Sequence, residues 1–176
     1  MGMEERTAAW ADIDPTPFRE ARLERGLTVA ALVSFEGPPR GRAALVSQWA
    51  TTGGGRAFEL GMEWDGYPYF MVSGTGQARG MGIVYAEQPL ERATTVLLSG
   101  SFEPGRRMAI YANGIELGEN EAVVPASVHR PDRGIRVGGR PGCGTSCASH
   151  LYAPGHSPDS RPAYQDLSSS ASRSRS

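Results

Sequence analysis

The stretch of residues 93–118, ATTVLLSGSFEPGRRMAIYANGIELG, decides the fold of this chain. Its apolar residues alternate with polar ones, which predicts three consecutive strands, over residues 94–102, 108–112 and 115–117. Glu103-Pro104-Gly105 and Asn113-Gly114 separate these strands, and both segments supply the φ values that tight turns require. Consecutive antiparallel strands with one apolar face indicate a sheet that packs against a second layer.

Outward from this stretch, short apolar runs predict further strands over residues 27–35, 43–49, 56–62, 67–73, 81–86 and 135–137. The run LTVAALVSF at residues 27–35 is almost unbroken, which predicts a strand covered on both faces. Pro68 predicts an edge position or a strand start. Strands this short bury enough apolar surface only in two packed layers, so we expect an all-β jelly-roll β-sandwich of two antiparallel sheets.

Length, composition and charge exclude several classes of protein. At 176 residues one domain is expected, and the formal net charge is only −1. All 18 basic residues are arginines scattered along the chain, which does not indicate nucleic-acid binding. No apolar run reaches the roughly 18 residues of a membrane-spanning helix. The N-terminus lacks the plan of a signal peptide, so we expect the chain as written in the cytoplasm, and exported if it belongs to a longer protein.

Composition divides the chain into three parts. We expect an irregular lead-in over residues 1–26, in which residues 17–25 form two helical turns or none. The predicted domain covers residues 27–142. Residues 143–176 are rich in Ser, Pro and Arg and poor in apolar residues, which predicts a disordered tail.

The tail also holds the one pattern that resembles a zinc site, Cys143, Cys147, His150 and His156. Its ligand pairs are crowded, whereas zinc fingers separate theirs by about 12 residues. No apolar residues nearby would form a small core around a metal. We therefore interpret these residues as incidental, and we expect no required cofactor.

The strands and turns occur in an order that resembles the laminin G-like, concanavalin A-like lectin/glucanase domains. The resemblance covers roughly residues 27–142 and rests on three blocks. The first is an F-x-L…D-G-x-x-x-F hairpin, matched by Phe58, Leu60, Asp65, Gly66 and Phe70. The second is a strand ending in G-x-F, a turn, and then I-Y-x-N-G, matched by Gly100, Phe102, Ile110, Tyr111, Asn113 and Gly114. The third is a final I-x-V-G, matched by Ile135, Val137 and Gly138.

Two departures from this pattern stand out. Relatives usually carry a tryptophan near residues 93–95, and this chain has none there. They also close a sheet with a strand of the type F-x-G-x-I-x-x-(V/I), whereas the sequence after Gly142 becomes polar. From the absence of that strand we expect an unpaired sheet edge. Truncation, or a change of reading frame near Gly142, would explain the departure.

The resemblance implies a non-catalytic binding or adhesion module whose partner is a carbohydrate or an extracellular protein. Aromatic side chains suit the apolar faces of sugars, and the candidates for such contacts are Trp49, Trp64, Tyr67, Tyr69 and Tyr85. Packing inside the sandwich is the competing role for these rings. A structural module or gene fragment without a ligand is a further alternative.

Hydrolysis of glycosides is the enzymatic alternative. Glucanases of this fold carry E-x-D-x-E on one strand, and alternation places Glu59, Gly61 and Glu63 on one face here. A retaining glycosidase needs two carboxyls about 5–5.5 Å apart, but glutamates four residues apart on a strand are ~13 Å apart at the backbone. We therefore favour a solvated strand face for Glu59 and Glu63. Calcium is a second possible ligand, with oxygen donors from Asp65 and Asn113, although two donors are too few to define a site.

Overall fold

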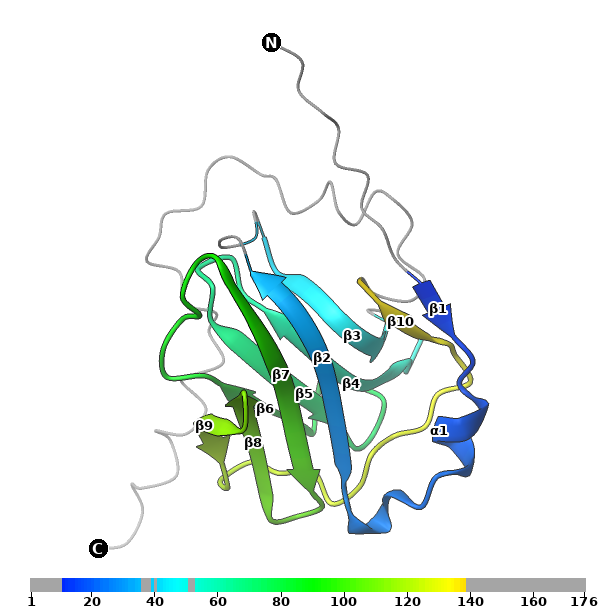
Figure 1. The fold of residues 1–176 in the computed structure, drawn as a ribbon. Helices are drawn as coiled ribbons and strands as arrows, with labels where there is room; N and C mark the ends of the chain where they lie inside the picture. The colour runs from blue at the N-terminus through cyan, green and yellow to red at the C-terminus, as the bar shows by residue number, and fades with distance from the viewer. Residues whose placement is uncertain (1–10, 36–38, 40, 51–52, 139–176) are drawn as a thin grey trace, which may run out of the picture.

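The computed structural model describes residues 11–35, 39, 41–50 and 53–138. These residues form two antiparallel sheets packed face to face (Figure 1). Sheet A has six strands in the order β1-β10-β3-β4-β5-β6, and sheet B has four in the order β2-β7-β8-β9. The predicted all-β jelly-roll sandwich is confirmed.

The strands of sheet A are β1 (Ala11–Ile13), β10 (Ile135–Val137), β3 (Ala43–Trp49), β4 (Arg56–Met62), β5 (Pro68–Ser73) and β6 (Met81–Tyr85). The strands of sheet B are β2 (Leu27–Phe35), β7 (Thr94–Glu103), β8 (Arg107–Ala112) and β9 (Ile115–Asn120). A short helix, α1 (Thr16–Glu20), and a 3-10 turn, η1 (Leu23–Arg25), connect β1 to β2. Neither of these two helices has the length and apolar character that crossing a membrane requires.

The turns of the central stretch have the predicted chemistry. Asn113 and Gly114 both have positive φ, 51° and 80°, as a type I′ turn between β8 and β9 requires. Between β7 and β8, Gly105 has a φ of 64°, and the Arg106 amide donates to the Glu103 carbonyl oxygen at 3.0 Å. The sequence of the turns therefore sets the β7–β8–β9 meander.

The core lies between the inner faces of the two sheets. From sheet B it contains Val96, Leu98, Phe102, Met108 and Ile110, and from sheet A it contains Phe58, Leu60, Phe70, Val72 and Val84. The sheets come closest where the ring of Phe70 lies on Gly100 of β7. A Cβ added to Gly100 would lie 2.6 Å from Phe70 Cδ2, so only a glycine fits at this point.

The structure corrects the expectation that β2 is covered on both faces. Only its inner face meets sheet A, and Leu32 on the outer face is 74% exposed. Pro68 is the first residue of β5, which lies between β4 and β6, so of the two predicted positions the strand start is the observed one.

The segment expected to be an irregular lead-in contributes to the domain. Residues 11–13 form β1, which pairs with β10, and Phe18 and Leu23 belong to the core. The Phe18 ring centroid lies 5.2 Å from that of Phe58. Residues 139–176, with the cysteine and histidine pattern and the position of the expected closing strand, lie outside the described residues.

The contact between Gly100 and Phe70 generates a stability prediction. We expect Gly100→Ala to lower the free energy of unfolding by about 1–3 kcal/mol, because the added methyl group forces the sheets or the ring to move. The matched control is Gly134→Ala, whose new Cβ would meet only the Ile13 carbonyl oxygen at 3.6 Å, and which we expect to change stability by less than about 1 kcal/mol. Urea denaturation measures both variants, and equal midpoints would contradict the proposed contact.

Candidate functional site

The outer face of sheet A, which points away from sheet B, carries a row of side chains that crosses all six strands. The strand register places these residues opposite one another in the order Asp12, Arg136, Ser47, Glu59, Met71 and Ile83. Because side chains alternate along a strand, each of these residues points away from the core. Three of the six carry a charge, so this face differs in chemistry from the inner face.

Glu59 is fully buried at the centre of this row. The Ser47 hydroxyl donates a hydrogen bond of 2.9 Å to Glu59 Oε2, and the Tyr69 hydroxyl donates one of 2.7 Å to Oε1. The expectation that Glu59 lies on a solvated strand face is therefore wrong. The reason is that β3 and β5, on either side of β4, supply hydroxyl groups that replace water around the carboxylate.

The space between Glu59 and Glu63 is filled by Tyr69. Gly61 lies between the two glutamates on β4 and pairs with Tyr69 across the sheet. A Cβ added to Gly61 would lie 2.5 Å from Tyr69 Cζ and 2.5 Å from the Ala43 carbonyl oxygen. The middle acid of an E-x-D-x-E motif therefore has no room here.

Arg42, Glu63, Tyr69 and Tyr85 form a group that we call the Arg42 cluster. The guanidinium carbon of Arg42 lies 4.0 Å from the centroid of the Tyr69 ring, a cation–π contact. Arg42 Nε is 3.2 Å from Glu63 Oε1, and Nη2 donates to Met71 Sδ at 3.1 Å. The rings of Tyr69 and Tyr85 have centroids 6.2 Å apart. Several contacts thus fix the orientation of the guanidinium.

Burial and the neighbouring groups shift the pKa values of Arg42 and Tyr85. Burial by itself lowers the pKa of Arg42, but the neighbouring Tyr69, Glu63 and Glu59 outweigh it and leave that pKa raised. Burial raises the pKa of Tyr85, and Glu63 adds to the rise while Arg42 opposes it. At neutral pH the cluster therefore presents a fixed cation beside a neutral phenol.

The five aromatic candidates lie in two places. Trp49 and Tyr69 are buried in a small apolar cluster with Met71 on the outer face of sheet A. Tyr85, beside Tyr69, is 38% exposed. Trp64 and Tyr67 lie in the β4–β5 turn, where Trp64 is 55% exposed. Among these five rings, Tyr85 and Trp64 offer the most surface to a ligand.

The two calcium candidates belong to different sheets. Asp65 lies in the β4–β5 turn of sheet A, where its Oδ1 accepts from the Tyr67 amide at 3.4 Å. Asn113 lies in the β8–β9 turn of sheet B, where its Oδ1 accepts from the Leu97 amide at 2.9 Å. Within the described ranges, no three His, Cys, Asp or Glu side chains are grouped as metal ligands.

At the end of the row, Arg136 and Asp12 join β10 to β1. Arg136 Nε donates to Asp12 Oδ1 at 2.7 Å and Nη2 donates to Oδ2 at 3.0 Å. This bidentate bond lowers the pKa of Asp12. The pair holds the short strand β1 in the sheet.

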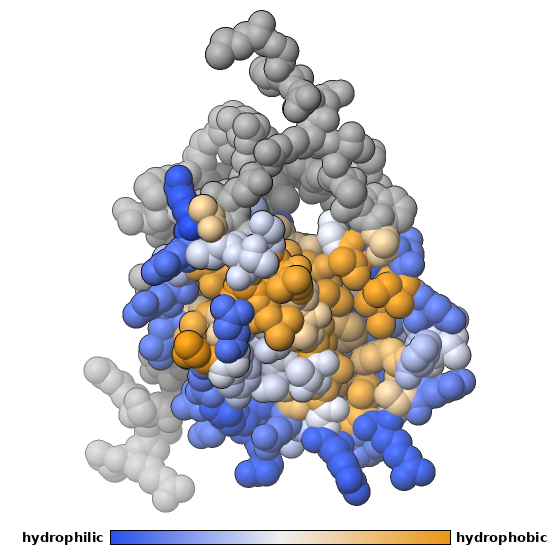
Figure 2. Space-filling view, viewed as in Figure 1, coloured by the Kyte–Doolittle hydropathy of each residue, from blue (hydrophilic) through white to orange (hydrophobic). Residues whose placement is uncertain are grey.

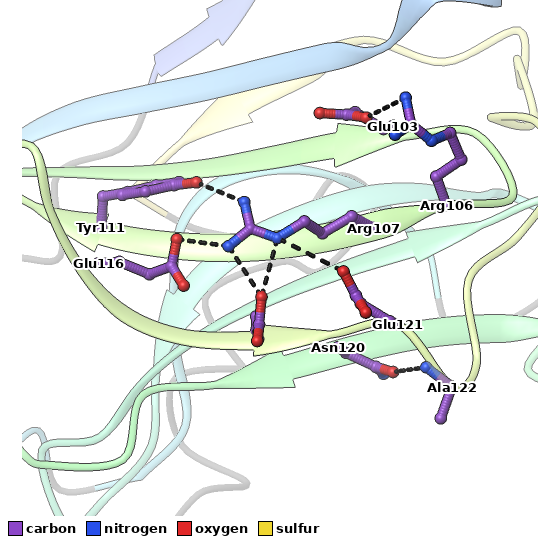
Figure 3. Close-up of polar contacts among 9 residues, drawn as sticks. Glu103, Arg106, Arg107, Tyr111, Glu116, Asn120, Glu121 and Ala122 are labelled. Atoms are coloured by element: carbon purple, nitrogen blue, oxygen red, sulfur yellow. Dashed lines mark hydrogen bonds and ion pairs between the residues drawn. The ribbon is translucent and has the colours of Figure 1, made fainter.

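The outer face of sheet B carries a second charged group, centred on Arg107 (Figure 3). Its Nη2 lies 2.6 Å from Glu116 Oε2, its Nε donates to Glu119 Oε2 at 2.9 Å, and its Nη1 donates to the Tyr111 hydroxyl at 3.2 Å. The bonds to Glu116 and Glu119 raise the pKa of Arg107. We interpret this group as a set of ion pairs that joins β8 to β9, because its acids are engaged with the arginine.

Sequence reasoning missed Arg42, Ser47 and the pair of Arg136 with Asp12. Ser47 faces Glu59 only because β3 contains an irregularity between Ala44 and Val46, which shifts the register. Arg42 precedes β3 and has no motif around it. The one available signal was the alternation in β10, Ile135–Val137, which places Arg136 on the opposite face of the sheet from its two apolar neighbours.

The hydrogen bonds to Glu59 generate a second prediction. We expect Tyr69→Phe to lower the free energy of unfolding by about 1–3 kcal/mol, because it removes a donor to a buried carboxylate. Tyr111→Phe is the matched control, since that hydroxyl contacts Arg107 on a more exposed face, and we expect a loss below about 1 kcal/mol. Chemical denaturation compares the two, and equal losses would show that the Glu59 network does not stabilise sheet A.

Comparisons with known proteins bear on the fold. No family model matches the sequence, and no curated protein does either. The solved binding domain of botulinum neurotoxin serotype C1 is similar in structure, with a TM-score of 0.51 and 6% identity over 73% of this chain and 30% of that one. Domains LG4-5 of the mouse laminin α1 chain give a TM-score of 0.47 and 17% identity, over 67% of this chain and 29% of that one.

A carbohydrate binding module from Bacillus subtilis gives a TM-score of 0.38 and 15% identity, over 64% of this chain and 67% of that one. The chain thus spans about 30% of the length of the laminin and neurotoxin chains. At 6% identity the likeness to the neurotoxin domain concerns the fold alone, and it agrees with the topology of the two sheets. The fold of this chain is a concanavalin A-like jelly roll.

Proposed function

We propose that this domain is a non-catalytic binding module, that its ligand is a carbohydrate, and that the ligand contacts the Arg42 cluster. The observation that carries the proposal is the position of Tyr85, a residue that is 38% exposed and lies beside Arg42 and Glu63. An aromatic ring covers the apolar face of a sugar, and a neighbouring cation and carboxylate bind its hydroxyl groups.

The rigidity of the cluster supports the proposal. Arg42 is held by the Tyr69 ring, by Met71 and by Glu63 before any ligand arrives. Binding therefore orders few side chains, and less of the interaction free energy is lost as conformational entropy. Trp64, in the turn that follows Glu63, is a second exposed ring for an extended glycan.

Two features argue against hydrolysis. Glu59 is fully buried and accepts hydrogen bonds from Ser47 and Tyr69, so it offers no free carboxyl to a substrate. The Tyr69 side chain covers Gly61, and this leaves no open space between Glu59 and Glu63 for a glycosidic bond. A neighbour of the same fold is described as the binding domain of a neurotoxin, which accords with a binding role.

Glycan binding with variants of the cluster tests the proposal. We expect a panel of oligosaccharides to contain at least one that binds, and Tyr85→Ala to weaken that binding by about tenfold, because loss of a stacked ring costs about 1–1.5 kcal/mol. The control is Tyr111→Ala on sheet B, which we expect to leave affinity unchanged. Isothermal titration calorimetry, run in chelator and again in calcium, measures affinity and any dependence on the metal.

Three results would contradict the proposal. The first is that no glycan binds, which would favour a structural module. The second is equal weakening by Tyr85→Ala and Tyr111→Ala, which would place the site elsewhere. The third is release of reducing sugar by the wild-type protein and its loss in Glu59→Gln, which would favour a glycoside hydrolase.

A further inference from the structure

Sheet A extends past sheet B on the side of β2. The register places one inner-face residue from each strand of sheet A in a second row, in the order Ala11, Val137, Val46, Leu60, Phe70 and Val84. Leu60 and Phe70 are fully buried, Val46 is partly buried, and Val137 is 38% exposed. Burial along this single row is therefore lost at β10 and β1, where no described strand of sheet B lies opposite.

The neighbouring inner-face position shows the same exposure. Ile13 of β1 pairs with Ile135 of β10, and Ile13 is 47% exposed. The apolar surface continues from β2 to β10 and β1 in the space-filling view, toward the right of Figure 2. Apolar side chains that face the interior of a sandwich and still meet water indicate that part of the covering layer is missing.

The edge of β2 borders this uncovered surface. Within the described part of the chain β2 pairs only with β7, so alternate residues direct their N–H and C=O groups away from the sheet. The strand is nine residues long, LTVAALVSF, and contains neither a charge nor a proline. Natural sheets usually protect such edges with charges, prolines or bulges.

The opposite edge of sheet B does carry this protection. β9 presents Glu116 and Glu119, and Leu117 O accepts from the Glu87 amide at 2.8 Å. The contrast between the two edges of one sheet indicates that β2 is an edge adapted to pairing.

We infer that one extended segment of a partner polypeptide adds to β2 as a fifth strand of sheet B. Its main chain bonds the free N–H and C=O groups of β2, and its alternate apolar side chains cover Ile13, Ile135 and Val137. The partner must be a strand, since sugars, lipids and helices do not match a repeating edge of backbone groups.

The overhang of sheet A selects a single strand over a second copy of this chain. In a closed dimer, β2 would pair antiparallel with its own copy about a twofold axis perpendicular to the sheet. That axis places the copy's sheet A on the same side as the first, where β10 and β1 already extend beyond β2. A lone strand fits above β10 without this collision.

The composition of residues 139–176 also favours a partner chain over this chain's own C-terminal segment. A strand that covers the exposed positions needs large apolar residues at alternate places. Residues 139–176 are rich in Ser, Pro and Arg and contain no Val, Ile, Phe, Met or Trp. Their leucines and tyrosines, at positions 151, 152, 164 and 167, do not alternate. They therefore lack the pattern that the uncovered surface requires.

Peptide binding to the full chain tests the inference. The probe is a synthetic peptide of alternating valine and threonine, as long as β2, with a lysine at each end. Its control has the same composition with a proline at the centre, which removes one N–H and disrupts the strand. Amide spectra of the isotope-labelled chain, titrated to millimolar peptide, should change at β2, β10 and β1, and exchange of the outward-facing β2 amides should slow at least tenfold.

Variants locate the site. We expect Val137→Thr to weaken binding of the alternating peptide severalfold, because it places a hydroxyl beneath the added strand. Val123→Thr changes an exposed valine outside the strands and should leave binding unchanged. Both positions are exposed enough for the fold to tolerate the change, and unfolding curves check this.

Four results would overturn the inference. The first is equal binding of the two peptides, and the second is that neither peptide shifts the signals of the β2 amides. The third is protection of the outward-facing β2 amides in the monomeric free chain, which would mean that residues of this chain pair with β2. The fourth is a dimer in which those amides are protected, which would assign the edge to a second copy.

Discussion

The contact of the Phe70 ring with Gly100 sets the distance between the two sheets. A β-sandwich is held by side chains that fill the space between its layers, and the fully buried Leu60, Phe70 and Phe102 lie there. The ring of Phe70 occupies the space that a side chain at residue 100 would need, so the middle of sheet A approaches β7 closely. The remaining strands of each sheet pair outward from these central strands.

The two faces of sheet A perform different tasks because side chains alternate along each strand. The inner row, from Val46 through Leu60 to Phe70, is apolar and forms the core. The outer row places Ser47 beside Glu59, and Tyr69 reaches the same carboxylate from β5. The hydrogen bonds to the buried Glu59 hold Tyr69 in place. Arg42 and Tyr85 both contact the Tyr69 ring. The proposed binding surface thus depends on the buried carboxylate of Glu59 and on its hydrogen bonds to Ser47 and Tyr69.

The two edges of sheet B differ in the same way. Charges on β9 pair with Arg107 and shield that edge, whereas β2 offers an uncharged backbone edge beside exposed Ile13 and Val137. The two proposals therefore concern separate surfaces with distinct chemistry, a polar aromatic one on sheet A and an uncharged backbone edge on sheet B. The two proposals are independent, since one concerns the outer face of sheet A and the other the gap beside β2.

Much of the fold was predictable because local chemistry determines it. Asn113-Gly114 specifies a tight turn, and the alternation of Val96, Leu98 and Phe102 specifies the buried face of β7. β1 was not predictable, because three residues carry too little pattern and their place depends on Arg136, more than a hundred residues away. For the site, alternation correctly grouped Glu59 with Glu63, but burial of Glu59 depends on Ser47 and Tyr69 from other strands. Exposure of Leu32 likewise follows from the number of sheets that pack on β2, which a single strand does not encode.

Amide hydrogen exchange along β2 and β7 in the free chain tests the packing of the two sheets and the open edge of sheet B most directly. A four-stranded sheet B with β2 at its edge predicts strong protection throughout the interior of β7, and protection that alternates along β2, with every second amide exchanging fast. Uniform protection of all β2 amides would contradict the open edge. Fast exchange throughout β7 would contradict the packing of the two sheets against each other.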